Sequence, residues 1–214
     1  MSKPAKIESA ERNPERSRER ILSAALKEFA AKGFAGARVD LIARKAAINK
    51  RMLYHYFGDK EGLFKAVLRR KVSERRAWAV NLSSDPAERL PFWFQAACRD
   101  ADWVRLLEWE ALQSDGQKVI DEKERRAISA GWLKRLRERQ KRGELSSAFD
   151  ALHIALAIQS LTMFPVAFPQ LTRLLTGKSI FDAKFQRAHA EFLRKFAAAF
   201  QAGHKRRAKI NFIK

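Results

Sequence analysis

The sequence of 214 residues contains a single cysteine, Cys98. One cysteine forms neither an internal disulfide nor a cysteine metal cluster, so it favours a reducing compartment. No apolar run reaches the ~18 residues that a membrane-spanning helix needs. The N-terminal stretch also lacks the apolar core of a secretory signal. We therefore expect a cytoplasmic protein that does not contact a membrane.

Patterns that carry catalysis or bind cofactors are also missing. The nine glycines are scattered and form no phosphate-binding loop, and no two of the four histidines stand at metal-binding helical spacing. No serine lies in a nucleophile elbow. Glu108 and Glu110 are two residues apart on an expected helix and so face different ways. Either could orient a ligand, but we interpret both as helix-interface residues. The sequence predicts no enzyme, no metal site and no cofactor.

Acidic residues are few, since 24 Asp and Glu stand against 44 Lys and Arg, for a net charge of +20. Residues 1–80 contain 20 basic and 9 acidic residues, and the longer remainder contains 24 and 15. Positive charge is therefore densest near the N-terminus, which favours a nucleic-acid partner. A merely soluble basic surface and attraction to an anionic membrane are the alternatives.

The strongest pattern in the chain lies in residues 33–61. Val39, Ile42 and Ala43 recur at helical spacing and lead into a turn. Asn49 is a good N-cap for a second short helix over residues 50–57. Gly58 can supply a positive φ after that helix, and the residue that follows it caps the next one. Two short helices joined by a tight turn predict a helix-turn-helix.

The second of these helices has two unlike faces. Leu53, Tyr56 and Phe57 stand three and four residues apart and form its apolar face. The opposite face is basic and aromatic and consists of Lys50, Arg51, Met52, Tyr54 and His55. Such a face is typical of a helix that reads DNA, although an ordinary hairpin with a solvated basic face would also produce it.

From about residue 16 to residue 70 the sequence resembles, without a gap, the DNA-binding domain of the TetR family. The most specific stretch is residues 53–61, LYHYFGDKE. Further matching residues are Arg20-Ile21-Leu22, Ala25, Phe29, Gly33-Phe34, Ile42-Ala43, Ile48-Asn49-Lys50 and Leu63. Three positions depart from the family: Arg38 stands where Thr or Ser is usual, Arg51 where Gly or Ala is usual, and Met52 where Thr is usual. The base preferences of relatives therefore do not transfer to this chain.

The resemblance implies an all-α, homodimeric bacterial regulator, most often a repressor. An N-terminal helix-turn-helix domain would bind a palindromic double-stranded DNA operator, and a C-terminal helical domain would dimerise and bind a small apolar or amphipathic effector. A ligand-blind regulator controlled by a partner protein, and a helical enzyme or adaptor with a basic face, are the alternatives. The residues expected to contact DNA are Arg38, Asn49, Lys50, Arg51, Met52, Tyr54, His55, Tyr56 and Lys60.

Within that set we expect different roles. Tyr54 and Lys60 would hold phosphates, Lys60 with the help of a helix N-terminus. The side chains that face away from the core would read base edges or neighbouring phosphates. Arg51 is the best candidate for bidentate contact with guanine, because its guanidinium fork fits the guanine edge.

We expect four segments along the chain: a disordered arm at 1–15, the DNA-binding domain at 16–76 with its motif at about 38–57, a regulatory and dimerisation domain at 77–201, and a basic tail at 202–214. In the regulatory domain, Pro91 should kink or delay a helix that starts at Pro86. Further helices are predicted at 117–140, at 149–164 before a break at Pro165, and from Asp182, with a short connector at 171–177.

All five tryptophans fall between residues 78 and 132. They could line an apolar cavity or simply fill the core, because composition does not separate the two. The resemblance favours an effector pocket. The candidate ligand-binding residues are Trp78, Trp93, Trp103, Trp109 and Trp132.

Aromatic residues recur at steps of three and four along the last helix, which is typical of a helix-packing seam. Together with the helix at 149–164, this stripe predicts a four-helix dimer interface. The candidate interface residues are His153, Phe185, His189, Phe192 and Phe196.

Overall fold

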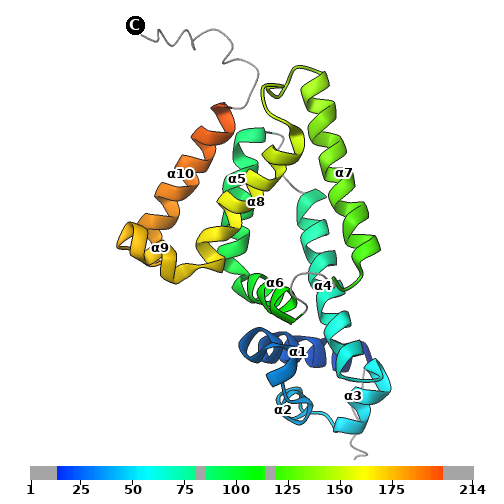
Figure 1. Cartoon of the computed structure of the whole chain (residues 1–214). Helices are drawn as coiled ribbons and strands as arrows, with labels where there is room; N and C mark the ends of the chain where they lie inside the picture. Colours follow the sequence, from blue (N-terminus) through cyan, green and yellow to red (C-terminus); the bar gives the residue numbers. More distant parts are fainter. Residues whose placement is uncertain (1–13, 81–84, 114–118, 200–214) are drawn as a thin grey trace, which may run out of the picture. The chain divides into compact units, whose positions relative to one another are not determined.

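The computed structural model describes residues 14–80, 85–113 and 119–199. These residues form helices joined by turns and contain no strand, so the predicted all-α class is confirmed (Figure 1). The helices belong to two compact units, and the division falls between Lys71 and Val72, inside one long helix. Apart from residues 14 and 15, the expected N-terminal arm lies outside the described residues, as does the expected basic tail.

The first unit contains α1 (Pro14–Gly36), α2 (Val39–Lys45), α3 (Lys50–Phe57) and the first half of α4 (Lys60–Val80). Three phenylalanines hold α1 against α4. The ring centroid of Phe64 lies 4.9 Å from that of Phe29 and 5.4 Å from that of Phe34. Gly33 has φ 68° and interrupts α1, which appears as a kink with a short helical extension after it.

Local signals set both ends of α3. Oδ1 of Asn49 accepts a hydrogen bond of 2.8 Å from the backbone N–H of Arg51, which confirms the predicted N-cap. The turn between α2 and α3 contains Ala47 in a left-handed conformation with φ 51°, unusual for a residue with a Cβ. The other end of α3 stops at Gly58, which has φ 76°.

The junction between α3 and α4 leaves no room for a side chain at Gly62. A Cβ built there would lie 2.1 Å from the carbonyl oxygen of Phe57. The N–H of Gly62 also donates a 2.7 Å hydrogen bond to Oδ1 of Asp59, which caps α4 as predicted. The missing side chain at Gly62 therefore lets the end of α3 contact the first turn of α4.

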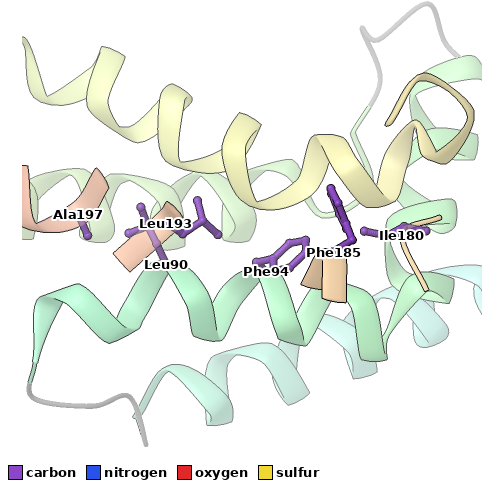
Figure 2. Close-up of a cluster of buried hydrophobic side chains, with 6 residues drawn as sticks. All are labelled: Leu90, Phe94, Ile180, Phe185, Leu193 and Ala197. Atoms are coloured by element: carbon purple, nitrogen blue, oxygen red, sulfur yellow. The ribbon is translucent and has the colours of Figure 1, made fainter. Parts of the chain in front are cut away.

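The second unit contains α5 (Pro86–Arg99), α6 (Ala101–Gln113), α7 (Glu122–Lys141), α8 (Ala151–Ala167), α9 (Pro169–Thr176) and α10 (Ala183–Ala199). Helix α5 packs against both α8 and α10. Figure 2 shows the buried side chains that fill this region, which are Leu90, Phe94, Ile180, Phe185, Leu193 and Ala197. A helix that packs against two others in this way needs apolar residues on more than one side, and α5 has them.

A buried carboxylate fastens α6 to the start of α7. Nη1 of Arg125 lies 2.7 Å from both oxygens of Glu110, and the N–H of Ile120 donates to Oε1 of Glu110 at 2.9 Å. Glu110 is only 7% exposed. The interpretation of Glu110 as a helix-interface residue is therefore confirmed.

Three predictions about prolines and boundaries were wrong. Helix α5 begins at Pro86, as predicted, and includes Pro91. Helix α8, by contrast, does not break at Pro165 but continues through it to Ala167. The expected connector at 171–177 belongs to a two-turn helix, α9, which has Pro169 in its first turn. Helix α7 begins at Glu122 rather than at 117.

The passage of α8 through Pro165 has a visible compensation. Proline has no N–H, so the carbonyl of Leu161, four residues earlier, loses its usual donor within the helix. Nε2 of His189 on α10 lies 3.0 Å from that carbonyl oxygen. Because a carbonyl only accepts, Nε2 must carry the proton and donate it. A side chain from another helix thus replaces the lost hydrogen bond.

No single helix among the described residues has both the length and the apolar character to cross a bilayer. Helices α8 and α9 are long and apolar enough only when they are taken together, and they meet at an angle of 91°.

Gly62→Ala should destabilise the first unit by about 1–3 kcal/mol, because the added Cβ overlaps a backbone oxygen that has no freedom to move away. Gly131→Ala is the matched control. Its Cβ would lie an ordinary 3.6 Å from Nη1 of Arg135, inside α7. The control should gain about 0.5–1 kcal/mol from lower backbone entropy in the unfolded chain. Denaturant unfolding followed by circular dichroism measures both, and an unchanged midpoint for Gly62→Ala would contradict the close approach.

Candidate functional site

Helix α3 buries one side and exposes the other, as its sequence predicts. Leu53 and Phe57 are 0% and 9% exposed. Met52 and Tyr56 are half-buried, so Tyr56 lies at the edge of the apolar face. The exposed side chains, which we call the outer face of α3, are Lys50, Arg51, Tyr54 and His55. The structure thus brings four of the predicted DNA-contacting residues onto one exposed surface.

Two contacts organise the outer face and the helix under it. Nζ of Lys50 lies 5.8 Å from the ring centroid of Tyr54, one turn further along α3. The guanidinium of Arg18 on α1 lies 5.5 Å from the ring centroid of Phe57. Cations at such distances are attracted to aromatic faces. These contacts restrain α3, so the polar side chains of its outer face project from a helix in a defined position.

Two of the predicted DNA-contacting cations, Lys60 and Arg38, have partners within the chain. Nζ of Lys60 donates to the carbonyl oxygen of Ala35 at 3.2 Å and lies 5.1 Å from the ring centroid of Phe34. Arg38 forms an exposed ion pair of 2.9 Å with Asp40, and this hydrogen bond lowers the pKa of the Asp40 carboxyl. If Lys60 or Arg38 bound a DNA phosphate, the phosphate would replace the partner that the side chain now has within the chain.

An ion pair that sequence reasoning missed fixes α2 against α1. Nζ of Lys45 lies 3.0 Å from Oε2 of Glu28, whose side chain is 4% exposed. Glu28 lies among apolar residues on the buried side of α1. A carboxylate in such a position needs a positively charged partner, and this is how the sequence could have indicated the ion pair. Without Lys45, whose side chain is 48% exposed, the buried Glu28 carboxylate would lose this compensating charge, which is unfavourable. Glu28 therefore helps to hold the first helix of the motif in place.

The five tryptophans do not form one group. Trp78, Trp93 and Trp103 each lie within 6 Å of one guanidinium, that of Arg75. Trp132 packs instead on a separate apolar cluster around Leu136. Sequence reasoning did not single out Arg75, although its position three residues before Trp78 on α4 places the two on one helix face.

The predicted dimer stripe is divided by the structure. Phe185 is 9% exposed and belongs to the core cluster of its own chain, so it offers no surface to a partner. His189 is half-buried and its ring centroid lies 4.5 Å from that of Phe94. Phe192 is 46% exposed, whereas Phe196 is half-buried. His153 on α8 is exposed, with Nδ1 3.4 Å from Oδ1 of Asp150.

Burial raises the pKa of two side chains of the second unit, Cys98 and Glu108. Burial raises the pKa of the Cys98 thiol to about 11, so the thiol stays protonated at neutral pH and is a poor nucleophile. Burial also raises the pKa of Glu108, against the opposing effect of Arg105. Oε1 of Glu108 is buried without a hydrogen-bond partner.

Comparison with known proteins agrees with this geometry. Residues 21–67 match the family described as bacterial regulatory proteins, tetR family, and residues 87–204 match a tetracyclin repressor-like C-terminal domain. The chain belongs to the TetR family. Members of this family bind operator DNA and act as dimers. The TetR-family chain is accordingly a DNA-binding transcriptional regulator.

Named relatives of this TetR-family regulator extend over most of its length. It is 33% identical over 172 residues to the HTH-type transcriptional repressor SCO4008 of Streptomyces coelicolor, which covers 78% of this chain and 88% of the relative. It is 32% identical over 161 residues to the HTH-type transcriptional repressor NicS of Pseudomonas putida, which covers 70% and 76%. The crystal structure of the regulator SCO4942 of Streptomyces coelicolor matches with a TM-score of 0.68 at 30% identity and covers 84% of this chain and 97% of that one.

Arg51→Ala should flatten the base preference at one position in each half-site, with a loss of ~1–3 kcal/mol at that base pair, while affinity for unrelated DNA barely changes. Selection from random DNA and binding titrations measure the two effects. Lys60→Ala provides the contrast: it should weaken specific and nonspecific DNA by similar factors and lower the log–log salt slope by about one unit per site. If Arg51→Ala selects the same site as the wild type, Arg51 contacts phosphate or solvent instead.

Proposed function

We propose that this TetR-family regulator is a ligand-responsive repressor that acts as a homodimer on a palindromic operator. The observation that carries the proposal is the exposed outer face of α3, which contains Lys50, Arg51, Tyr54 and His55 on a helix fixed at both ends. The names of SCO4008 and NicS, both transcriptional repressors, support repression as the direction of control.

Each subunit would place α3 in a major groove. Backbone contacts from cations and the Tyr54 hydroxyl would set the position of the helix, and side chains of the outer face would read base edges. A net charge of +20 would favour encounter with DNA and make the affinity depend strongly on salt. Two subunits related by a twofold axis would read two half-sites of inverted sequence.

An effector would act on this binding through linkage. A ligand that binds one arrangement of the two DNA-reading helices better than the other changes operator affinity by the ratio of its two affinities. The operator must then change ligand affinity by the same factor. The candidate effector region is the second unit, where three of the five tryptophans surround one arginine.

Selection from random double-stranded DNA should return an inverted repeat whose half-site centres lie about one helical turn, or a multiple of it, apart. The full-length protein should bind this DNA site. It should bind a DNA site with one half-site scrambled much more weakly, because only one α3 is then matched. A control variant, Arg137→Ala, removes an exposed arginine of α7 and should select the wild-type site. Failure to enrich any sequence at low salt would contradict the proposed function.

Exposed apolar side chains of the second unit support dimerisation through α8 and α10. On α8, Leu152, Leu156 and Phe164 are 47%, 58% and 40% exposed and stand four and eight residues apart. These spacings place them on one side of the helix. Phe192 on α10 is similarly exposed. A partner subunit would remove this surface from water.

Leu156→Glu should convert the dimer to a monomer at micromolar concentration, because it places a charge in an apolar contact. Leu112→Glu is the control, since Leu112 on α6 is 72% exposed and lies outside the proposed interface. Analytical ultracentrifugation distinguishes the two states. A wild-type protein that sediments as a monomer, or a Leu156→Glu variant that remains a dimer, would contradict this interface.

A further inference from the structure

One guanidinium in the second unit lies among three indole rings. Cζ of Arg75 on α4 is 5.1 Å from the ring centroid of Trp93, 5.5 Å from that of Trp103 and 5.8 Å from that of Trp78. The three tryptophans come from α5, α6 and α4, so three helices converge on one cation. Energetically significant cation–π contacts occur about once per 70–80 residues in proteins. Three on one side chain make this an unusual environment, which we call the Arg75 cage.

The cage holds the charge but leaves one guanidinium nitrogen without a hydrogen-bond partner. Nη1 of Arg75 is buried and has no hydrogen-bond partner. Indole faces attract a cation but offer no lone pair along an N–H direction, and the indole N–H is only a donor. A buried charged donor without an acceptor is costly. An arginine used only to pack helices together would be expected to have its N–H groups paired.

The electrostatics of the cage favour one added negative charge. Burial lowers the pKa of Arg75 and nearby Asp100 partly offsets this, yet an arginine remains charged in any protein environment. A carboxylate is singly charged and accepts hydrogen bonds from the guanidinium fork. A dianionic phosphate would meet the negative charge of Asp100 with only one cation in the cage. The site therefore suits a monoanion.

The rings suggest what the rest of the ligand must be. Trp103 is 7% exposed, whereas Trp78 and Trp93 are only half-buried. Partly exposed indole faces bind flat apolar groups by stacking. Solvent-accessible rings beside a buried, unpaired N–H give a ligand both an apolar contact and a polar anchor, which is the usual composition of a small-molecule site.

We propose that Arg75, Trp78, Trp93 and Trp103 form the effector site of this regulator and that the effector is a small aromatic carboxylate. The carboxylate accepts from Nη1 of Arg75, and its ring lies against the exposed indoles. This assignment rests on the proposed ligand-responsive function and specifies the chemical class of the ligand. It also separates the tryptophans, since Trp132 lies on another cluster and takes no part.

The test compares a carboxylate with its neutral isostere. 4-Fluorobenzoate and 4-fluorobenzamide have the same ring and differ in charge, and ¹⁹F NMR titration of the full-length protein measures both. We expect 4-fluorobenzoate to bind at least about 10-fold more tightly, which is the effect of one charge-assisted hydrogen bond. Equal affinities for the two ligands would overturn the proposal. The absence of 4-fluorobenzoate binding at ~10 mM would also overturn it, because a Kd of ~1 mM is expected of so small a ligand.

Variants locate the site. Arg75→Gln should remove the preference for the carboxylate, and Arg75→Lys, which keeps the charge but not the fork, should retain part of it. Arg76→Gln is the matched control, because Arg76 is the next residue on α4 and is exposed. Its affinity for 4-fluorobenzoate should equal that of the wild type. A carboxylate preference that survives in Arg75→Gln would place the site elsewhere.

Selection of operator DNA without ligand keeps this inference separate from the proposed function. A wild-type protein that selects an inverted repeat but shows no Arg75-dependent carboxylate binding refutes the effector class alone. A protein that binds the carboxylate through Arg75 but enriches no DNA refutes the proposed function alone. If Arg75→Gln does not fold, a weakened carboxylate preference in Arg75→Lys, with none lost in Arg76→Gln, still places the site at Arg75, and an unchanged preference in Arg75→Lys overturns the assignment.

Discussion

The contact between the end of α3 and the first turn of α4 is the constraint on which the placement of α3 depends. The carbonyl oxygen of Phe57 occupies the space where residue 62 would otherwise carry a side chain, and Gly58 reverses the chain with a positive φ. The Asn49 cap sets the other end of α3. The backbone of α3 is therefore ordered by folding, so little backbone conformational entropy remains to be lost when DNA binds.

The parts of the fold that the sequence predicted well depend on neighbouring residues in the chain. Helices α3, α5 and α10 each begin after a capping residue, which is Asn49, Asp85 or Asp182. The side chain of each cap accepts a hydrogen bond from the backbone N–H two residues later. Such capping operates within one turn, so a single sequence reveals it. The outer face of α3 was predictable for the same reason, because an eight-residue helix with two buried apolar residues fixes which side remains exposed.

The failures arose where distant residues compensate for a local penalty. A proline at position 165 should end a helix by removing one hydrogen bond, but His189 from α10 supplies a donor to the orphaned carbonyl of Leu161. Periodicity along α10 assigned His189 and Phe185 to a partner subunit, whereas both pack largely within their own chain. An apolar stripe states that a face is buried. It does not state whether the covering surface belongs to the same chain or to another.

Two arginines, Arg51 and Arg75, illustrate how sequence alone fails to identify the surroundings of a side chain. Arg51 and Arg75 are two of 44 basic residues and look alike in a list of charges. Arg51 is exposed on α3 because its helix neighbours Leu53 and Phe57 take the inner side. Arg75 lies among three indoles only because α4, α5 and α6 converge there. The two arginines lie on consecutive helices. Arg51 is on α3, and α4, which follows it, begins with Lys60 and includes Arg75 about four turns later. The proposed ligand-binding Arg75 therefore lies on the same helix whose first turn contacts the end of α3.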